Sequence, residues 1–257
     1  MNAGNRPPED GLPAHEDAMV TPPEEDTRPH WEVIAEREEG VPASQERFTR
    51  HAFIVPVPRQ ALRGELALPY GSRGLIVLAD ICAAADDPAA AALCAALHEE
   101  RFATLRIGLL HDEECRFADA GEHLPLLTER LLAVVGRLRQ QIAVETVLAL
   151  PTGLVAERGM TPVAVRVAAQ RDDDVRALVC HGGLIDLAGL QYLRLLQAPL
   201  LFLADAEDEA SAANAQRALP HLGGASRLET LADADADERQ AQRIAHTVAW
   251  FRDHLAP

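Results

Sequence analysis

The sequence predicts an α/β fold in which a mostly parallel central sheet carries helices on both faces, preceded by a disordered acidic N-terminal arm. Two observations predict this fold class. From His51 onward, short β-rich runs alternate with alanine-rich helical windows, which is typical of parallel strands joined by crossover helices. One of these runs, Gly74 to Ala79, is apolar at nearly every position, as expected of a strand buried on both faces.

The arm is predicted over residues 1–50 and a single domain over residues 51–257. The first fifty residues hold seven prolines and twelve acidic residues against five arginines. Such a stretch cannot bury enough apolar surface to offset the entropy lost on ordering. Only Trp31, Val33 and Ile34 offer a short docking segment, so we expect the arm to contact a protein partner if it has a role.

The strands and helices of the domain are expected in the following order. Ala52 to Val57 and Leu62 to Leu68 form the opening strands, and Asp87 caps a helix that ends near Glu100. The later strands are expected at 102–110, 146–150, 177–180 and 200–203, and the later helices at 118–141, 163–170, 212–219 and 239–254.

Charge and composition exclude several classes of function. A net charge of -16 opposes binding to nucleic acid or to an anionic membrane surface. The sequence has no apolar run of about 18 residues and no signal-peptide core, so we expect a cytoplasmic protein. The remaining partners are a small-molecule ligand, a protein, or further subunits in a homo- or hetero-oligomer.

Metal ions and cofactors are not expected either. The four cysteines, Cys82, Cys94, Cys115 and Cys180, form no C-x-x-C pair, and we expect them to be reduced and mostly buried. The histidines show no H-x-x-x-H spacing, which gives no support for a metal site. No glycine-rich phosphate loop occurs, so a nucleotide cofactor is not expected.

Several strings between residues 60 and 255 are similar to a known family. They are GELALP at 64–69, GLIVLAD at 74–80, FATLR at 102–106, CHGGLIDLAG at 180–189, APLLFL at 198–203 and WFRDHL at 250–255. With the order of elements, they make the chain resemble the dienelactone-hydrolase-like branch of the α/β-hydrolases, including hydrolase-like modules that accompany some phosphoribosyltransferases. The resemblance implies an α/β-hydrolase fold with a Ser-His-Asp site in the active members.

The resemblance also implies a Gly-x-Ser-x-Gly turn, the nucleophile elbow, within residues 146–161. This window contains neither Ser nor Cys. Depending on the register, Pro151, Val155 or Arg158 stands at the nucleophile position, and none of these side chains can attack a carbonyl. Thr152 is the hydroxyl nearest the turn, but leucines two places to either side stand where small residues are needed.

The family's other site positions carry three aspartates. Asp208 matches the acid of the triad. Asp235 lies in the segment where the family's histidine is expected, and a carboxylate cannot replace an imidazole as the proton shuttle. Asp80 stands where a His-Gly pair helps to build the oxyanion hole, and its negative charge would oppose an oxyanion.

Two cysteines are alternative nucleophiles. Cys180 neighbours His181, but successive residues of a strand point to opposite faces. Cys82 lies near acidic residues, which would raise the pKa of its thiol. The leading hypothesis is therefore a catalytically silent α/β-hydrolase-like protein that acts as a binding or scaffolding module, with Asp80, Arg158, Asp208 and Asp235 at the former site. The alternative is an esterase or lactone hydrolase whose non-standard nucleophile is Cys180, Cys82 or Thr152.

Overall fold

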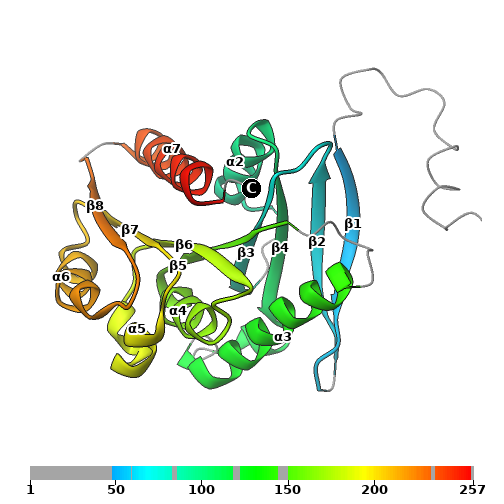
Figure 1. The fold of residues 1–257 in the computed structure, drawn as a ribbon, viewed down its shortest axis with the longest axis horizontal. Coiled ribbons are helices and arrows are strands. Elements are labelled where there is room, and N and C mark those ends of the chain that lie inside the picture. The colour runs from blue at the N-terminus through cyan, green and yellow to red at the C-terminus, as the bar shows by residue number, and fades with distance from the viewer. Residues whose placement is uncertain are drawn as a thin grey trace, which may run out of the picture. The chain divides into compact units, whose positions relative to one another are not determined.

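The computed structural model describes residues 48–58, 60–82, 86–117, 122–143, 150–232 and 235–255, which build one eight-stranded sheet with helices on both faces (Figure 1). The strands are β1 (Phe48–Val55), β2 (Leu62–Pro69), β3 (Gly74–Cys82), β4 (Phe102–Leu110), β5 (Thr152–Glu157), β6 (Val175–His181), β7 (Leu200–Asp205) and β8 (Ser226–Leu231). The α-helices are α2 (Pro88–Glu99), α3 (Leu124–Ala143), α4 (Thr161–Gln170), α5 (Leu190–Leu195), α6 (Glu209–Ala218) and α7 (Ala236–His254). The short 3-10 helices are η1 (Glu114–Arg116), η3 (Arg158–Met160), η4 (Ile185–Ala188) and η5 (Leu219–His221).

The strand order is β1-β2-β4-β3-β5-β6-β7-β8. The pairs β1–β2 and β2–β4 are antiparallel, and all pairs from β4 to β8 are parallel. The carboxyl ends of six strands therefore meet at one edge of the sheet, where open α/β sheets bind ligands. The predicted fold class is confirmed.

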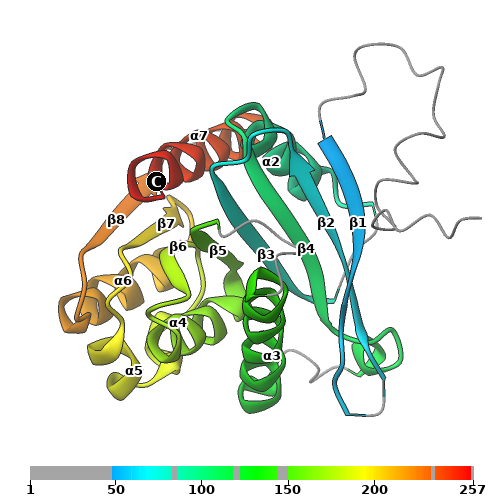
Figure 2. The ribbon, with the colours of Figure 1, turned by 45° about the vertical axis from the view of Figure 1, so that its right-hand side comes forward.

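The apolar run of β3 is explained by its position between two cores. Leu75 and Val77 belong to a core that includes residues of α3 and α4, whereas Ile76 and Leu78 belong to a second core with residues of α2 and α7. Figures 1 and 2 show α2 and α7 together on one face of the sheet and α3 to α6 on the other. Both faces of the strand need apolar side chains, because both are covered.

Several local predictions are confirmed. Asp87 caps α2, since its carboxylate accepts hydrogen bonds from the backbone N–H groups of Ala89 (2.9 Å) and Ala90 (3.2 Å), with Pro88 in the first turn. The strand predicted at 102–110 is β4 with the same bounds. The helices predicted at 163–170, 212–219 and 239–254 correspond to α4, α6 and α7.

Other boundaries were wrong. The strand expected at 146–150 is β5 at Thr152–Glu157; residues 146–149 lie outside the described residues, and Leu150 is not part of a strand. β1 spans Phe48–Val55 instead of the predicted Ala52 to Val57, and residues 1–47 of the predicted arm lie outside the described ranges. α5 and the bounds of β8 were not predicted.

The expectation of four reduced cysteines is wrong. Cys82 and Cys115 form a disulfide with their Cα atoms 6.0 Å apart, whereas Cys94 and Cys180 are free and buried. The physical reason is topological: Cys82 pairs in register with Leu110 of the neighbouring strand β4, and the chain after β4 returns Cys115 to the same place. In the described part of the chain, no helix combines the length and apolar character needed to cross a bilayer.

Candidate functional site

The strand-to-helix turn of the family lies at Arg158. β5 ends at Glu157, Arg158 has a positive φ of 45°, and α4 begins at Thr161. This is the backbone strain expected of an elbow apex. The registers with Pro151 or Val155 at the apex are wrong, because Pro151 precedes β5 and Val155 is buried within it.

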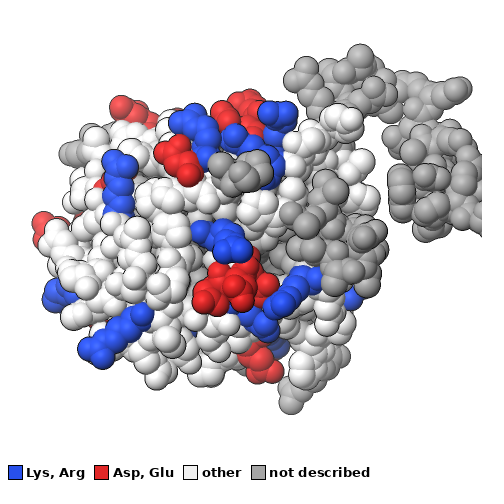
Figure 3. All heavy atoms as spheres, in the orientation of Figure 1, with Lys and Arg blue, Asp and Glu red and all other residues white. Residues whose placement is uncertain are grey.

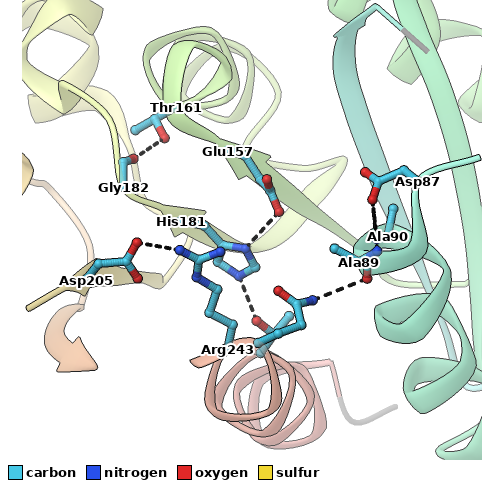
Figure 4. Close-up of polar contacts among 11 residues, drawn as sticks. Asp87, Ala89, Ala90, Glu157, Thr161, His181, Gly182, Asp205 and Arg243 are labelled. Atoms are coloured by element: carbon cyan, nitrogen blue, oxygen red, sulfur yellow. Dashed lines mark hydrogen bonds and ion pairs between the residues drawn. The ribbon is translucent and has the colours of Figure 1, made fainter. Parts of the chain in front are cut away.

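The turn packs directly against the loop after β6. A Cβ atom added to Gly183, whose φ is +91°, would lie 2.1 Å from the carbonyl oxygen of Arg158. Only glycine fits this contact. Thr161, in the first turn of α4, donates a hydrogen bond to the carbonyl oxygen of Gly182 at 2.7 Å, so both sides of the turn are fixed to the same loop (Figure 4).

A chain of polar contacts runs beneath the turn from β5 through β6 to α7 (Figure 4). Nδ1 of His181 lies 3.2 Å from the carboxylate of Glu157, and its Nε2 lies 2.9 Å from the hydroxyl of Thr247. A carboxylate can only accept hydrogen bonds, so Nδ1 of His181 carries a proton and donates a hydrogen bond to Glu157. In the neutral imidazole Nε2 then has no proton, and it accepts a hydrogen bond from the hydroxyl of Thr247. The hydrogen bond from His181 is the main reason why the pKa of Glu157 is lowered.

Helix α7 also pairs the acids at the carboxyl end of β7. Arg243 forms an ion pair with Asp205, and Arg239 lies 3.2 Å from Glu207. Gln240 reaches across to donate a hydrogen bond to the carbonyl oxygen of Ala89 in α2 at 3.3 Å. Figure 4 shows the α7 side chains reaching toward the ends of β6 and β7, so α7 covers part of the carboxyl edge.

Asp80 lies on β3 at the same edge, as the resemblance implied. Burial, and to a smaller extent the negative charges of Glu157 and Asp87, raise its pKa to about 6 against a lowering by Arg106. Asp80 therefore titrates close to neutral pH, where a carboxyl group can exchange protons.

The other two predicted aspartates cap helices. Asp208 accepts hydrogen bonds from the backbone N–H (3.0 Å) and hydroxyl (2.7 Å) of Ser211, and these bonds lower its pKa. Ser211 in turn accepts from the N–H of Gly183, which links Asp208 to the elbow loop. Asp235 is the exposed N-cap of α7 and accepts from the N–H of Glu238.

None of the three alternative nucleophiles is placed to attack a substrate. Thr152 is the first residue of β5, at the opposite end of the strand from the elbow, and it is buried. Cys180 is fully buried, which raises its pKa to about 12. Cys82 has no thiol because it is in the disulfide. Cys180 and His181 point to opposite faces of the sheet, as predicted, since the first packs in the core with α4 residues and the second contacts α7.

Sequence reasoning missed Glu157, Thr247 and Arg243. Glu157 could have been found, because an acid directly before the elbow apex must lie at the carboxyl edge. His181 and Thr247 are 66 positions apart, and only the packing of α7 on the sheet brings them together. Among the described residues, no group of three or more His, Cys, Asp or Glu side chains is arranged to hold a metal ion.

No protein-family model matches the chain. It is 30% identical over 205 residues to two proteins of Mycobacterium tuberculosis, from strains CDC 1551 and H37Rv, which carry the name "putative phosphoribosyl transferase". The match covers 78% of this chain but 45% of each relative, so the chain spans about half the length of the curated relatives it matches.

Solved structures of the same fold cover nearly all of the described domain. A dienelactone hydrolase from Anabaena variabilis is 25% identical, with a TM-score of 0.73 over 81% of this chain and 99% of its own. A dienelactone hydrolase-like promiscuous phosphotriesterase from metagenomic libraries is 13% identical, with a TM-score of 0.66 over 82% of this chain and all of its own. With the strand order and the elbow described above, these likenesses show that the chain belongs to the α/β-hydrolase superfamily, in its dienelactone-hydrolase-like branch.

Proposed function

We propose that this chain is a non-hydrolytic member of its branch that binds a ligand carrying a carboxylate or phosphate group at the elbow. The single observation that carries the proposal is Arg158 at the apex of the turn, with a positive φ and an exposed side chain. A guanidinium group remains protonated in proteins and cannot attack a carbonyl carbon. Its chemistry is the recognition of oxyanions through paired N–H groups.

The charges around the apex support a binding role. The acids after β7 are paired by Arg243 and Arg239 from α7, whereas no described carboxylate forms an ion pair with Arg158. The guanidinium of Arg158 is therefore available to a ligand. The aspartate at position 80, where an oxyanion would form in an active relative, argues further against hydrolysis.

The test has a catalytic arm and a binding arm. Incubation with p-nitrophenyl acetate and with dihydrocoumarin should give no hydrolysis above buffer, whereas an active triad would raise the rate by several orders of magnitude. Calorimetric titration with benzoate and with inorganic phosphate should detect binding of at least one of them, and Arg158→Gln should abolish it. Arg252→Gln, at an exposed position near the end of α7, is the matched control and should bind like the wild type. Hydrolysis above buffer, or failure to bind either anion, contradicts the proposal.

A specific observation favours a second candidate function, an esterase with a non-standard nucleophile. Glu157, His181 and Thr247 have the order of an acid–imidazole–hydroxyl relay. Thr247 is 0% exposed, so α7 would have to move before an ester could reach its hydroxyl. Labelling of Thr247 by a fluorophosphonate probe, together with turnover that Thr247→Val abolishes, would establish this candidate in place of the first.

A further inference from the structure

The segment after β6 exposes an unusual number of leucines. Leu184, Leu187, Leu190 and Leu195 are between 41% and 57% exposed, and all lie within η4, α5 and the residues beside them. Single exposed leucines are ordinary on protein surfaces, but four of them between Leu184 and Leu195 are a concentration typical of an interaction site. We name this group, with the pocket beside it, the leucine face.

The fold itself does not need these four side chains. The same segment already gives the core Ile185, Ala188, Leu193 and Leu196, which are at most 2% exposed. Arg166 of α4 holds the segment in place by donating hydrogen bonds of 2.9 Å to the carbonyl oxygens of Leu187 and Ala188. The leucines are thus presented on a backbone that is already fixed, which lowers the entropic cost of binding a partner.

The leucine face contains a hollow as well as projecting side chains. A pocket of about 240 Å³ lies between α5 and α6 and is lined by Asp186, Leu190, Leu193, Arg217, Ala218 and His221. Its floor is apolar, and an acid and a base stand at its rim. Figure 3 shows isolated charged groups over α5 and α6 with uncharged surface between them.

The charged side chains beside the pocket indicate which partner the leucine face binds. Asp186 and Arg217 are both exposed, and neither forms an ion pair with another residue in the described ranges. In a two-fold interface, a residue of one copy contacts a second residue of the other copy, and the reverse contact forms as well. An acid and a base on either side of the axis therefore form two equivalent ion pairs. A face that carries a leucine projection, a leucine-lined hollow and one charge of each sign is complementary to itself.

We propose that the leucine face is a two-fold interface between two copies of this chain. Leu187 of one copy enters the pocket of the other, where it contacts Leu190, and Asp186 of each copy pairs with Arg217 of its partner copy. Leu184, which directly follows the Gly182–Gly183 loop at the elbow, places one border of this interface beside the candidate site.

The first experiment measures the mass of the full chain by sedimentation equilibrium at several concentrations. The wild type should have twice the chain mass of 27.8 kDa at high concentration. Leu190→Glu should raise the dissociation constant by roughly tenfold or more, because a charge would be buried at the centre of the interface. The matched control is Ile54→Glu on β1, since Ile54 and Leu190 are both 46% exposed, and it should leave the constant unchanged.

The second experiment tests the two-fold pairing directly. Asp186→Arg and Arg217→Asp should each weaken the dimer, because each places like charges opposite one another, and the double variant should restore the wild-type dissociation constant. A wild-type chain that stays monomeric overturns the proposal. So does a dimer that Ile54→Glu dissociates and Leu190→Glu does not, or a double variant as weak as the single ones.

Discussion

Two polar clusters lie at the carboxyl edge of the sheet, and they differ in how completely their groups are satisfied. The η1 cluster consists of Glu114, Arg130 and the Cys82–Cys115 disulfide. Arg130 is 8% exposed, and it donates hydrogen bonds of 2.6 and 2.7 Å to both carboxylate oxygens of Glu114 and one of 2.7 Å to the carbonyl oxygen of Leu109. The hydrogen bonds from Arg130 to the carboxylate are the largest cause that lowers the pKa of Glu114 to about 2, and the backbone N–H of His111 donates a further one.

The α7 cluster consists of Glu157, His181, Asp205, Arg243 and Thr247, and it is less completely satisfied. Glu157 is 54% exposed, and one carboxylate oxygen of Asp205 is buried without a hydrogen-bond partner among the described residues. Buried groups left without partners are rare in structural clusters and more frequent where a protein functions. The comparison teaches that the η1 cluster is a closed set of partnered groups that fixes the edge, whereas the α7 cluster keeps polar atoms with unused hydrogen-bonding capacity.

The largest expected effect concerns the disulfide of the η1 cluster. Cys82→Ser combined with Cys115→Ser should lower the free energy of unfolding by about 3 to 4 kcal/mol, since the bond closes a loop with a sequence separation of 33. Urea denaturation measures the loss. In dithiothreitol the wild type should unfold at the same urea concentration as the variant, and a difference that persists there would show that the bond is not its cause.

A smaller effect is expected for the ion pair of the same cluster. Arg130→Met should cost about 2 to 3 kcal/mol, less than for a fully buried pair because Glu114 is 35% exposed. The matched control is Arg139→Met in the same helix. Its contact with Asp174 at 3.6 Å should contribute less than about 1 kcal/mol, because the Arg139 side chain is 64% exposed. Equal losses for the two variants would show that the Arg130–Glu114 pair stabilises the protein no more than the Arg139–Asp174 contact does.

The sequence predicted most of the fold that carries these clusters but little of their contacts. The alternation of strands and helices, the Asp87 cap and the bounds of β4 followed from local patterns. β5 was misplaced because the apolar string at 146–150 resembles a strand, whereas the true strand contains Gly153 and ends in Glu157. The local apolar pattern favours a strand at 146–150. The strand at Thr152–Glu157 is selected by a tertiary contact, because the turn that follows it packs against Gly183.

The site contacts depend on distant parts of the chain. Arg158 was among the three apex registers that the sequence allowed, and Asp80 and Asp208 lie at the carboxyl edge as expected. The partners of His181 could not be predicted, because Thr247 reaches it from another element across the sheet edge. The disulfide likewise requires knowing that β3 and β4 are neighbours.

In the α7 cluster, Thr247→Val should cost about 1 to 2 kcal/mol. The substitution keeps the shape of the side chain but leaves Nε2 of the buried His181 without its hydroxyl partner. Thr247→Ser keeps the hydroxyl and is the matched control, with a smaller loss from one missing methyl group. Urea denaturation of both variants separates the two effects, and a Thr247→Val protein as stable as the wild type would mean that the contact is not formed in solution.

The smallest expected effect distinguishes Glu114 of the η1 cluster from Asp80 on β3, which lies outside both clusters, by the sign of the pH dependence. Glu114 has a lowered pKa, so its contribution to stability is present above pH 4.5 and is lost as the pH falls toward 2. Asp80 has a pKa raised from 3.8 to about 6, so the folded state binds the extra proton and stability falls as the pH rises between these values.

Asp80→Asn should therefore stabilise the protein by about 1 kcal/mol at pH 7.5 and have little effect at pH 3.5, after allowance for partial exposure. Glu114→Gln should do the opposite, destabilising the protein at pH 7.5 and losing its effect toward pH 2. Thermal melts of both variants across this range measure the two slopes. If both variants respond to pH in the same direction, the carboxyl groups of Glu114 and Asp80 do not differ electrostatically as the structure indicates.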